Sequence, residues 1–253
     1  MTGLLLRLAG PMQSWGEDRV FGRRNTLRHP TRSGLIGLFG AVRGVPRGGS
    51  FAEYDDITVT VRIDRDGLYM SDYQTAGGGL PANRTAPMAG GGYRDRSTAT
   101  IQTWRPFLAD AVFTVAVTGP ESVIRPTAEA LEAPFWQPYL GRRSYLPEQP
   151  MLLRSGVADP ADALRTRLPL PPQRDRTTGV EFIHEHPLED ASRHHTRTSV
   201  KDVPLPDRIG DGVERSFATR DVVVTTEALP EELHHDEHEA YRKALRAFIL
   251  EGR

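Results

Sequence analysis

The sequence contains no cysteine and no long apolar run. Without cysteine there are no disulfides, no zinc thiolates and no cysteine nucleophiles, and nothing indicates an oxidising compartment. The leucines of the first ten residues are interrupted by Arg7, so this apolar stretch is too short for a signal peptide or a membrane span. We therefore expect a cytoplasmic protein that contacts no membrane.

Lysine is nearly absent, since only Lys201 and Lys243 are lysine among the 32 lysine and arginine residues. Arginine suits bidentate contacts with phosphate, although a GC-rich coding sequence would produce the same bias. The formal net charge is only −1, but residues 1–47 contain eight arginines against two acidic residues. This uneven distribution indicates that the N-terminal part suits a polyanionic partner.

Common catalytic and nucleotide-binding motifs are missing. The segment GLIGLFG at 34–40 does not fit G-x-G-x-x-G after a strand, and neither G-x-x-x-x-G-K-[ST] nor G-x-S-x-G occurs. The run LHHDEHE at 233–239 lacks the H-E-x-x-H order of metalloproteases and is typical of a solvated helix face. Histidines 184, 186, 194 and 195 have no carboxylate partner at a metal-site spacing. We expect neither a metal site nor another cofactor.

Hydrophobic patterning predicts an α+β fold in a chain long enough for one large domain or two small ones. The predicted order is a strand, a helix, two strands paired as a hairpin through a DRDG turn, a further strand and a second helix. This order is close to the split β-α-β arrangement of ferredoxin-like domains. The strands are expected at 4–8, 57–63, 67–73 and 111–118, with an aperiodic excursion at 75–100; the second helix is expected at 121–131.

Beyond residue 138 the pattern changes. The segment YLGRRSYLPEQPMLL predicts a basic turn that runs into a strand, and residues 168–176 form a proline-rich connector. We expect a first domain at 1–150, a connector at 151–176 and a small antiparallel unit at 177–253. The unit's strands are expected at 180–184, 195–200 and 220–226, and its amphipathic helix, from residue 231, would bury Leu233, Tyr241, Ala244, Leu245 and Phe248.

The start of the first helix is a candidate anion site. The helix begins at a cap, Thr31 or Ser33, and Arg28 and Arg32 lie beside it. Free N–H groups and the helix dipole favour a phosphate there. A positive charge in the first turn opposes the dipole, so Arg32→Glu should be neutral or stabilising in the free protein and should weaken phosphate binding.

Aromatic and amide side chains accompany the arginines. Gln13 and Trp15 precede the helix, and the segment IQTWRPF places Trp104 beside Arg105. Such mixtures stack bases and hold nucleic-acid backbone, although each aromatic residue singly also fits the core. The sequence signature of RNA-recognition motifs that stack bases on strand faces is absent.

Five segments resemble a known family. LRLAGPMQSWG, PTRSGLIGLFGA, SDYQTAGGG, TIQTWRPFLADAVFTVAV and PYLGRRSYLPEQPMLL occur in this order between residues 6 and 153. They are similar to the CasD (Cas5) family of type I-E CRISPR Cascade subunits. The resemblance implies a ferredoxin-like (RRM-like) domain with an inserted thumb hairpin at about 72–104 and a small C-terminal β unit. It implies a non-catalytic role in antiviral defence, in which the protein caps the 5′ handle of crRNA.

The resemblance also implies partners and site residues. The partners are crRNA, the backbone subunit and the large subunit, with target DNA bound only indirectly. The loop at 10–16, the helix start at 31–34 and the turn at 141–144 would line the handle path, and the thumb would add contacts. The RNA-binding residues that we predict are Gln13, Trp15, Arg28, Thr31, Arg32, Ser33, Tyr73, Arg94, Gln102, Trp104, Arg105, Arg142, Arg143 and Ser144.

One alternative function remains open at this point. Some relatives in type I-C systems are endoribonucleases that cut precursor crRNA and use a lysine among their catalytic groups. This chain has no lysine before Lys201, and in type I-E systems a separate subunit cuts. Because histidine also transfers protons in RNA cleavage, the alternative is a metal-independent endoribonuclease that uses a histidine and a tyrosine.

Overall fold

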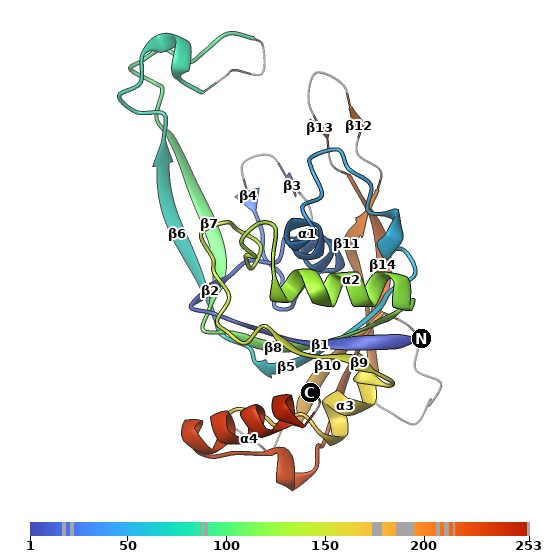
Figure 1. The fold of residues 1–253 in the computed structure, drawn as a ribbon. Helices are drawn as coiled ribbons and strands as arrows, with labels where there is room; N and C mark the ends of the chain where they lie inside the picture. Colours follow the sequence, from blue (N-terminus) through green and yellow to red (C-terminus); the bar gives the residue numbers. More distant parts are fainter. Residues whose placement is uncertain are drawn as a thin grey trace.

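A seven-stranded antiparallel sheet forms the centre of the computed structural model (Figure 1). Its strands lie in the order β11-β14-β10-β5-β8-β1-β9. They are β1 (Thr2–Ala9), β5 (Thr58–Arg65), β8 (Val112–Gly119), β9 (Leu152–Val157), β10 (Val180–His184), β11 (His195–Pro204) and β14 (Phe217–Glu227). The structure describes residues 1–16, 19–20, 23–86, 88, 91–173, 179–185, 195–205, 208–209, 213–214 and 216–251.

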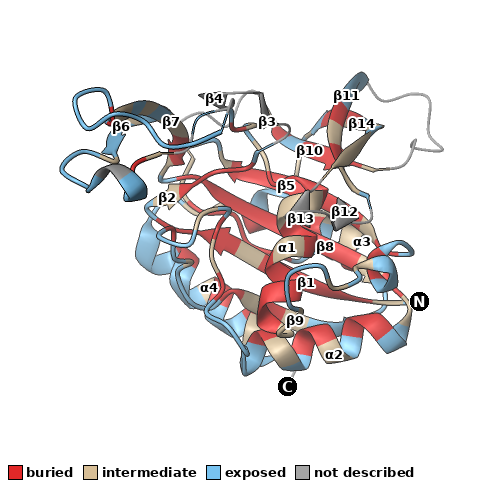
Figure 2. Ribbon diagram, turned by 90° about the horizontal axis from the view of Figure 1, so that it is seen from above, coloured by how far each residue is buried: buried red, intermediate tan, exposed pale blue. Residues whose placement is uncertain are grey.

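Helices cover both faces of this sheet, so the central strands are buried on two sides (Figures 1 and 2). On one face Leu4 and Leu6 of β1 belong to the larger apolar core, and on the other Leu5 belongs to a second core. A strand buried on both faces needs a continuous apolar run, which explains the leucines near the N-terminus. The upper helices in Figure 1 are α1 (Arg32–Val42) and α2 (Glu121–Glu132), and the lower ones are α3 (Pro160–Thr166) and α4 (His238–Leu250).

The elements predicted in the first part of the chain occur in the predicted order, but a strand at 101–109 that this order did not include precedes β8, and the expected hairpin does not form. The strands expected at 57–63 and 67–73 form as β5 and β6, but β5 pairs with β8 and β10, whereas β6 (Leu68–Ala76) pairs with β7 (Ile101–Ala109). The chain leaves the sheet at Gly67, whose φ is +74° and whose Cβ, if present, would lie 2.7 Å from the Ala109 carbonyl oxygen. The DRDG segment therefore separates two strands instead of pairing them.

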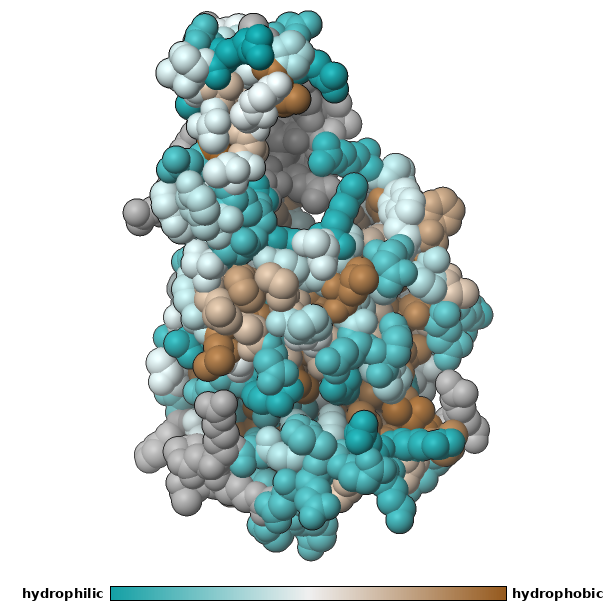
Figure 3. All heavy atoms as spheres, turned by 90° about the vertical axis from the view of Figure 1, so that its left-hand side faces the viewer, coloured by the Kyte–Doolittle hydropathy of each residue, from teal (hydrophilic) through white to brown (hydrophobic). Residues whose placement is uncertain are grey.

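Strands β6 and β7 form a long arm, defined here as residues 68–109, that projects from the body (Figure 1). The short strand β2 (Met12–Gln13) pairs with β7 at the base of the arm. The tip, residues 77–100, contains a 3-10 turn at Ala82–Arg84. Seen from the side of the arm, the tip shows hydrophilic and near-neutral residues with a few hydrophobic ones among them (Figure 3).

Three of the C-terminal strands belong to the central sheet, whereas β12 (Arg208–Ile209) and β13 (Val213–Glu214) pair with each other in a separate two-stranded sheet. Strand β10 pairs with β5, so β10, β14 and β11 extend the central sheet across the boundary expected near residue 177. The helix expected from residue 231 begins instead at His238, after a 3-10 turn at Glu231–Leu233. Helix α3 was not anticipated. The remaining elements are β3 (Arg19–Val20), β4 (Arg23–Arg24) and a 3-10 turn at Ala52–Tyr54.

Within the described part of the chain, no helix combines the length and the apolar character needed to cross a bilayer.

Candidate nucleic-acid interface

The N-terminus of α1 already has an anionic partner within the protein. Thr31 is the N-cap, as expected, and its Oγ1 accepts a hydrogen bond from the Gly34 N–H at 3.2 Å. The Arg32 N–H donates to Oδ2 of Asp202, on β11, at 2.6 Å. The Asp202 side chain is fully buried. A carboxylate therefore occupies the position at which we expected a phosphate.

The Arg32 side chain is part of the core and not of an RNA surface. The side chain is 9% exposed, and its Nη1 lies 2.7 Å from Oε2 of Glu185. It also donates to the carbonyl oxygens of Ile57 at 2.9 Å and Tyr54 at 2.8 Å. Arg220 completes the cluster, because it pairs with Glu185 at 3.1 Å. The expectation that Arg32 binds a phosphate is thus wrong, because its donors are already used inside the fold.

Gln13 and Trp15 are also internal. Both are 0% exposed. The Gln13 amide donates to the carbonyl oxygens of Leu8 at 3.2 Å and Ala111 at 2.8 Å, and the indole N–H of Trp15 donates to Oε1 of Gln13 at 3.2 Å. These bonds fix the loop after β1 to the end of β1 and the start of β8. Both residues therefore pack in the core, which was the alternative to base binding. Neither side chain can stack on a base in this structure.

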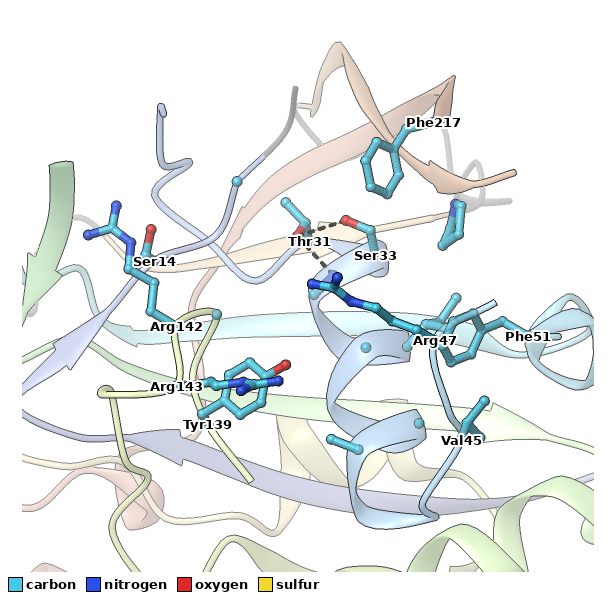
Figure 4. Close-up of a pocket in the computed structure, with 18 of the residues that line it drawn as sticks. Ser14, Thr31, Ser33, Val45, Arg47, Phe51, Tyr139, Arg142, Arg143 and Phe217 are labelled. Carbon is cyan, nitrogen blue, oxygen red and sulfur yellow. Dashed lines mark hydrogen bonds between the residues drawn. The ribbon is translucent and has the colours of Figure 1, made fainter. Parts of the chain in front are cut away.

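A cleft of about 970 Å³ lies beside the exposed side of α1. Three arginines line it, Arg47, Arg142 and Arg143, and none of its described lining residues is acidic. Arg142 and Arg143 approach from the turn after Tyr139, and Arg47 approaches from the side of Phe51 (Figure 4). Other lining residues include Thr31, Ser33, Gly37 and Ala41 at α1, and the aromatic residues Phe51, Trp136, Tyr139 and Phe217.

The three arginines differ in how they are held. The Arg142 guanidinium donates to the hydroxyl of Tyr145 at 2.7 Å and to the carbonyl oxygen of Pro106 at 2.8 Å, so it fixes the turn to the base of the arm. Arg47 and Arg143 are exposed, and within the described part of the chain neither makes a hydrogen bond or an ion pair. These two guanidinium groups can therefore bind an incoming anion without breaking an internal contact.

The basic turn is fixed against the loop that contains Trp15. The Ser14 N–H donates to the Leu140 carbonyl at 3.1 Å. Gly141 has a φ of +86°, and a Cβ at this position would lie 1.7 Å from the Ser14 carbonyl oxygen. Only glycine fits so close to another backbone segment. The sequence LGRR thus places Arg142 and Arg143 at the wall of the cleft through this close contact.

The arm carries a second group of the predicted residues. Tyr73 and Trp104 lie opposite each other in the register of β6 and β7, with ring centroids 5.2 Å apart. Their exposed fractions are 51% and 58%. Gln102, two residues from Trp104, shares this face, whereas Arg105 lies on the other face, opposite Asp72. An exposed aromatic pair of this kind offers two ring faces to a ligand.

The predicted set is therefore divided by the structure. Thr31, Ser33, Arg142 and Arg143 line the cleft, and Tyr73, Gln102, Trp104 and Arg105 lie on the arm. Arg94 is exposed at the tip of the arm, Arg28 and Ser144 are exposed but do not line the cleft, and Gln13, Trp15 and Arg32 belong to the interior. Sequence reasoning missed Arg47, Trp136, Tyr139 and Phe217. Proximity to LGRR was a signal for Trp136 and Tyr139, and the N-terminal arginine excess was a signal for Arg47.

The chemistry available at the cleft is binding chemistry. Unpaired guanidinium groups suit phosphates, and exposed rings suit bases. The described lining residues include one tyrosine and no histidine, lysine or carboxylate. Elsewhere in the described residues, no three His, Asp or Glu side chains are grouped closely enough to hold a metal ion.

Comparisons with known proteins agree with these observations. A family model described as CRISPR-associated protein (Cas_Cas5) matches residues 3–223. The CRISPR system Cascade subunit CasD of Escherichia coli (strain K12) is 37% identical over 226 residues, which are 86% of this chain and 93% of that protein. A chain of a solved CRISPR RNA-guided surveillance complex is 46% identical, with a TM-score of 0.84 over 98% of this chain and 99% of that one. A crystal structure of a Cas protein is 26% identical, with a TM-score of 0.58 over 90% of this chain and 98% of the other. The chain belongs to the CRISPR-associated Cas5 protein family.

Proposed function

We propose that the protein is the RNA-binding CasD subunit of a type I-E Cascade complex and holds the 5′ handle of crRNA in the cleft beside α1. The matched relatives are named as a Cascade subunit and as part of an RNA-guided surveillance complex. One observation carries the proposal. The cleft contains three arginines and, among its described lining residues, no carboxylate. Such a surface attracts a polyanion and repels a basic peptide.

The proposed contacts follow from the state of each side chain. Arg47 and Arg143 contact handle phosphates, because their guanidinium groups are exposed and unpaired. Arg142 positions the turn, because its donors already bind Tyr145 and Pro106. On the arm, Tyr73 and Trp104 stack on an RNA base or pack against the neighbouring backbone subunit.

The same cleft supports a non-catalytic role. General acid–base cleavage of RNA requires groups that accept and donate protons near neutral pH, and histidine is the usual one. The described lining includes Tyr139 and no histidine, lysine or carboxylate. We infer that the protein holds mature crRNA in the cytoplasm and that another subunit cuts the precursor.

The core also supports the ferredoxin-like class. Along the chain, β1, α1, β5, β8, α2 and β9 follow the β-α-β-β-α-β order. In the sheet the four strands lie in the order β5-β8-β1-β9, with every neighbour antiparallel. In this interpretation the arm is an insertion between the second and third strands, and β10, β14 and β11 are a C-terminal extension.

The test measures binding of a fluorescein-labelled RNA that carries the repeat-derived 5′ handle. The variant is the double substitution Arg47→Glu and Arg143→Glu, and the control is Arg246→Glu, an exposed arginine on α4 on the opposite face of the sheet. We expect the double variant to lose affinity by at least tenfold. The slope of log affinity against log salt concentration should also become shallower by about 0.7 for each lost phosphate contact. Equal affinity of the double variant and the control would contradict the proposal.

A second assay separates the alternative function. The purified chain is incubated with precursor repeat RNA in EDTA, and the products are sequenced. We expect intact RNA. Cutting at one position of the repeat, lost on Tyr139→Phe or on substitution of a histidine, would instead establish a metal-independent endoribonuclease.

A further inference from the structure

The segment after α2 presents two large aromatic rings to solvent. Phe135 and Trp136 are 69% and 45% exposed, and their ring centroids are 5.0 Å apart at an interplanar angle of 85°. Exposed rings of this size that touch each other often mark a binding surface. Only Trp136 lines the cleft.

The backbone that carries these rings is fixed to the end of α1. The Phe135 N–H donates to the Val42 carbonyl at 2.8 Å, and the Trp136 N–H donates to the Ala41 carbonyl at 3.3 Å. Gly44, with a φ of +72°, lies so close to Phe135 that a Cβ would be 2.7 Å from its ring. The backbone position of Trp136 is therefore set by the fold, and this part of the chain needs little ordering when a ligand arrives.

Open space adjoins Trp136 along the helix. Ala41, which accepts the Trp136 hydrogen bond, follows Gly37 by one helical turn, so both lie on the same side of α1. A Cβ at Gly37 would have no atom within 4 Å, whereas a Cβ at Gly34 would lie 2.9 Å from Trp15 and one at Gly40 would lie 2.3 Å from Phe51. Packing within the chain thus explains Gly34 and Gly40. It does not explain Gly37, although glycine inside a helix destabilises it.

We propose that Trp136 and the Gly37 side of α1 form a slot for one unpaired nucleobase. The base stacks on the Trp136 indole, and the flanking phosphates lie near Arg47 and Arg143. This inference rests on the proposed function and adds a base-binding residue to it. Stacking tolerates every base, because each one has a π face. The slot therefore fixes where the RNA chain lies and does not read its sequence.

The surroundings favour RNA over a protein side chain as the occupant. Arg47, Arg142 and Arg143 line the same cleft as Trp136, without an acidic residue among the described lining. An apolar peptide side chain gains nothing from these charges, whereas a nucleotide satisfies both the ring and the guanidinium groups. The cleft thus offers a nucleotide both an aromatic ring for its base and positive charge for its phosphates.

The first experiment compares Trp136→Leu and Trp136→Phe in the full chain with handle RNA. Leucine keeps apolar bulk without a π face, and phenylalanine keeps the face. We expect Trp136→Leu to lower affinity by about five- to a hundredfold and Trp136→Phe to retain most of it. Equal binding by the wild type and Trp136→Leu, both folded by circular dichroism, would overturn the slot.

The second experiment locates the base. Handle RNAs with one abasic nucleotide at each position are titrated against the wild type and Trp136→Leu. We expect one position at which base removal weakens binding to the wild type and leaves binding to Trp136→Leu unchanged. If every abasic effect were the same in both proteins, no base would stack on Trp136, and the inference would fail.

The third experiment tests Gly37. Gly37→Ala should raise the melting temperature, because alanine favours the helix and meets no neighbouring atom. It should also lower RNA affinity, because the methyl group occupies the slot. Higher stability with unchanged affinity would show that Gly37 is not part of the site.

The outcomes also distinguish this inference from the proposed function. If the wild type bound no handle RNA, both would fail. If it bound handle RNA with salt dependence but substitution of Trp136 had no effect, only the inference would fail.

Discussion

The carboxylate of Asp202 accepts a hydrogen bond from the backbone N–H of Arg32 at 2.6 Å, across 170 positions of sequence. Asp202 also pairs with Arg220 at 2.6 Å, and Arg32 pairs with Glu185 at 2.7 Å. Two buried acids and two arginines thus join the start of α1 to β10, β11 and β14. The charge at this helix end is therefore neutralised inside the protein, and the buried guanidinium of Arg32 is already paired.

The cluster predicts that Arg32→Glu is strongly destabilising, opposite to the expectation from the helix dipole alone. The substitution places a third carboxylate beside Glu185 and Asp202 and leaves the Ile57 and Tyr54 carbonyls without their donor. Breaking one partner of a buried pair costs about 3 to 5 kcal/mol of unfolding free energy. Urea denaturation measures this cost, with Arg47→Glu as the exposed control. An unfolding free energy close to that of the wild type would show that the cluster contributes little.

Neighbouring arginines of the basic turn should respond differently to truncation. Arg142→Ala removes hydrogen bonds to Tyr145 and Pro106, so we expect a loss of about 1 to 3 kcal/mol in unfolding free energy. Arg143→Ala should leave stability within about 0.5 kcal/mol of the wild type and weaken RNA binding. Thermal melting and RNA titration of both variants test the difference. Equal melting temperatures would contradict the structural role of Arg142.

The tip of the arm should be dispensable for folding. None of the described residues at 77–100 belongs to either apolar core, and Ala76 lies opposite Ile101 in the register. A two-residue Asn-Gly turn can therefore join β6 to β7 in place of residues 77–100. We expect an unchanged melting temperature and impaired assembly of the purified Cascade complex. A large fall in melting temperature would show that the tip stabilises the body.

Glu181 predicts a pH dependence of stability. Partial burial raises the pKa of its carboxyl above the ordinary value of 4.5, Asp66 raises it further, and Arg28 lowers it. The folded state then binds the proton more tightly than the unfolded state, so the favourable contribution is complete at low pH and declines as pH rises through the folded pKa. Glu181→Gln should raise the melting temperature at pH 7 and have little effect near about pH 3.5. A gain of equal size at both pH values would exclude this electrostatic cause.

Several elements could be predicted because their signals are local. The apolar run of β1, the alternation of β5 and the core face of α1 each lie within one short window, and Thr31 caps the helix as expected. The basic turn at 141–144 was also identified, and the structure places Arg142 and Arg143 at the cleft. Local patterns of this kind report burial and backbone conformation directly.

The sequence alone determined these local elements and the absence of cysteine chemistry, and it was enough to reveal the resemblance to the Cas5 family. Only the tertiary structure decided which of its polar and aromatic residues remain free to bind. Trp15 and Trp136 are the same residue type, yet one donates to Gln13 in the core and the other lines the cleft. Arg32 and Arg47 differ in the same way. Arg32 pairs with Glu185, whereas none of the described acidic residues pairs with Arg47. Burial and ion pairing depend on contacts between segments far apart in the chain, and sheet topology sets those contacts.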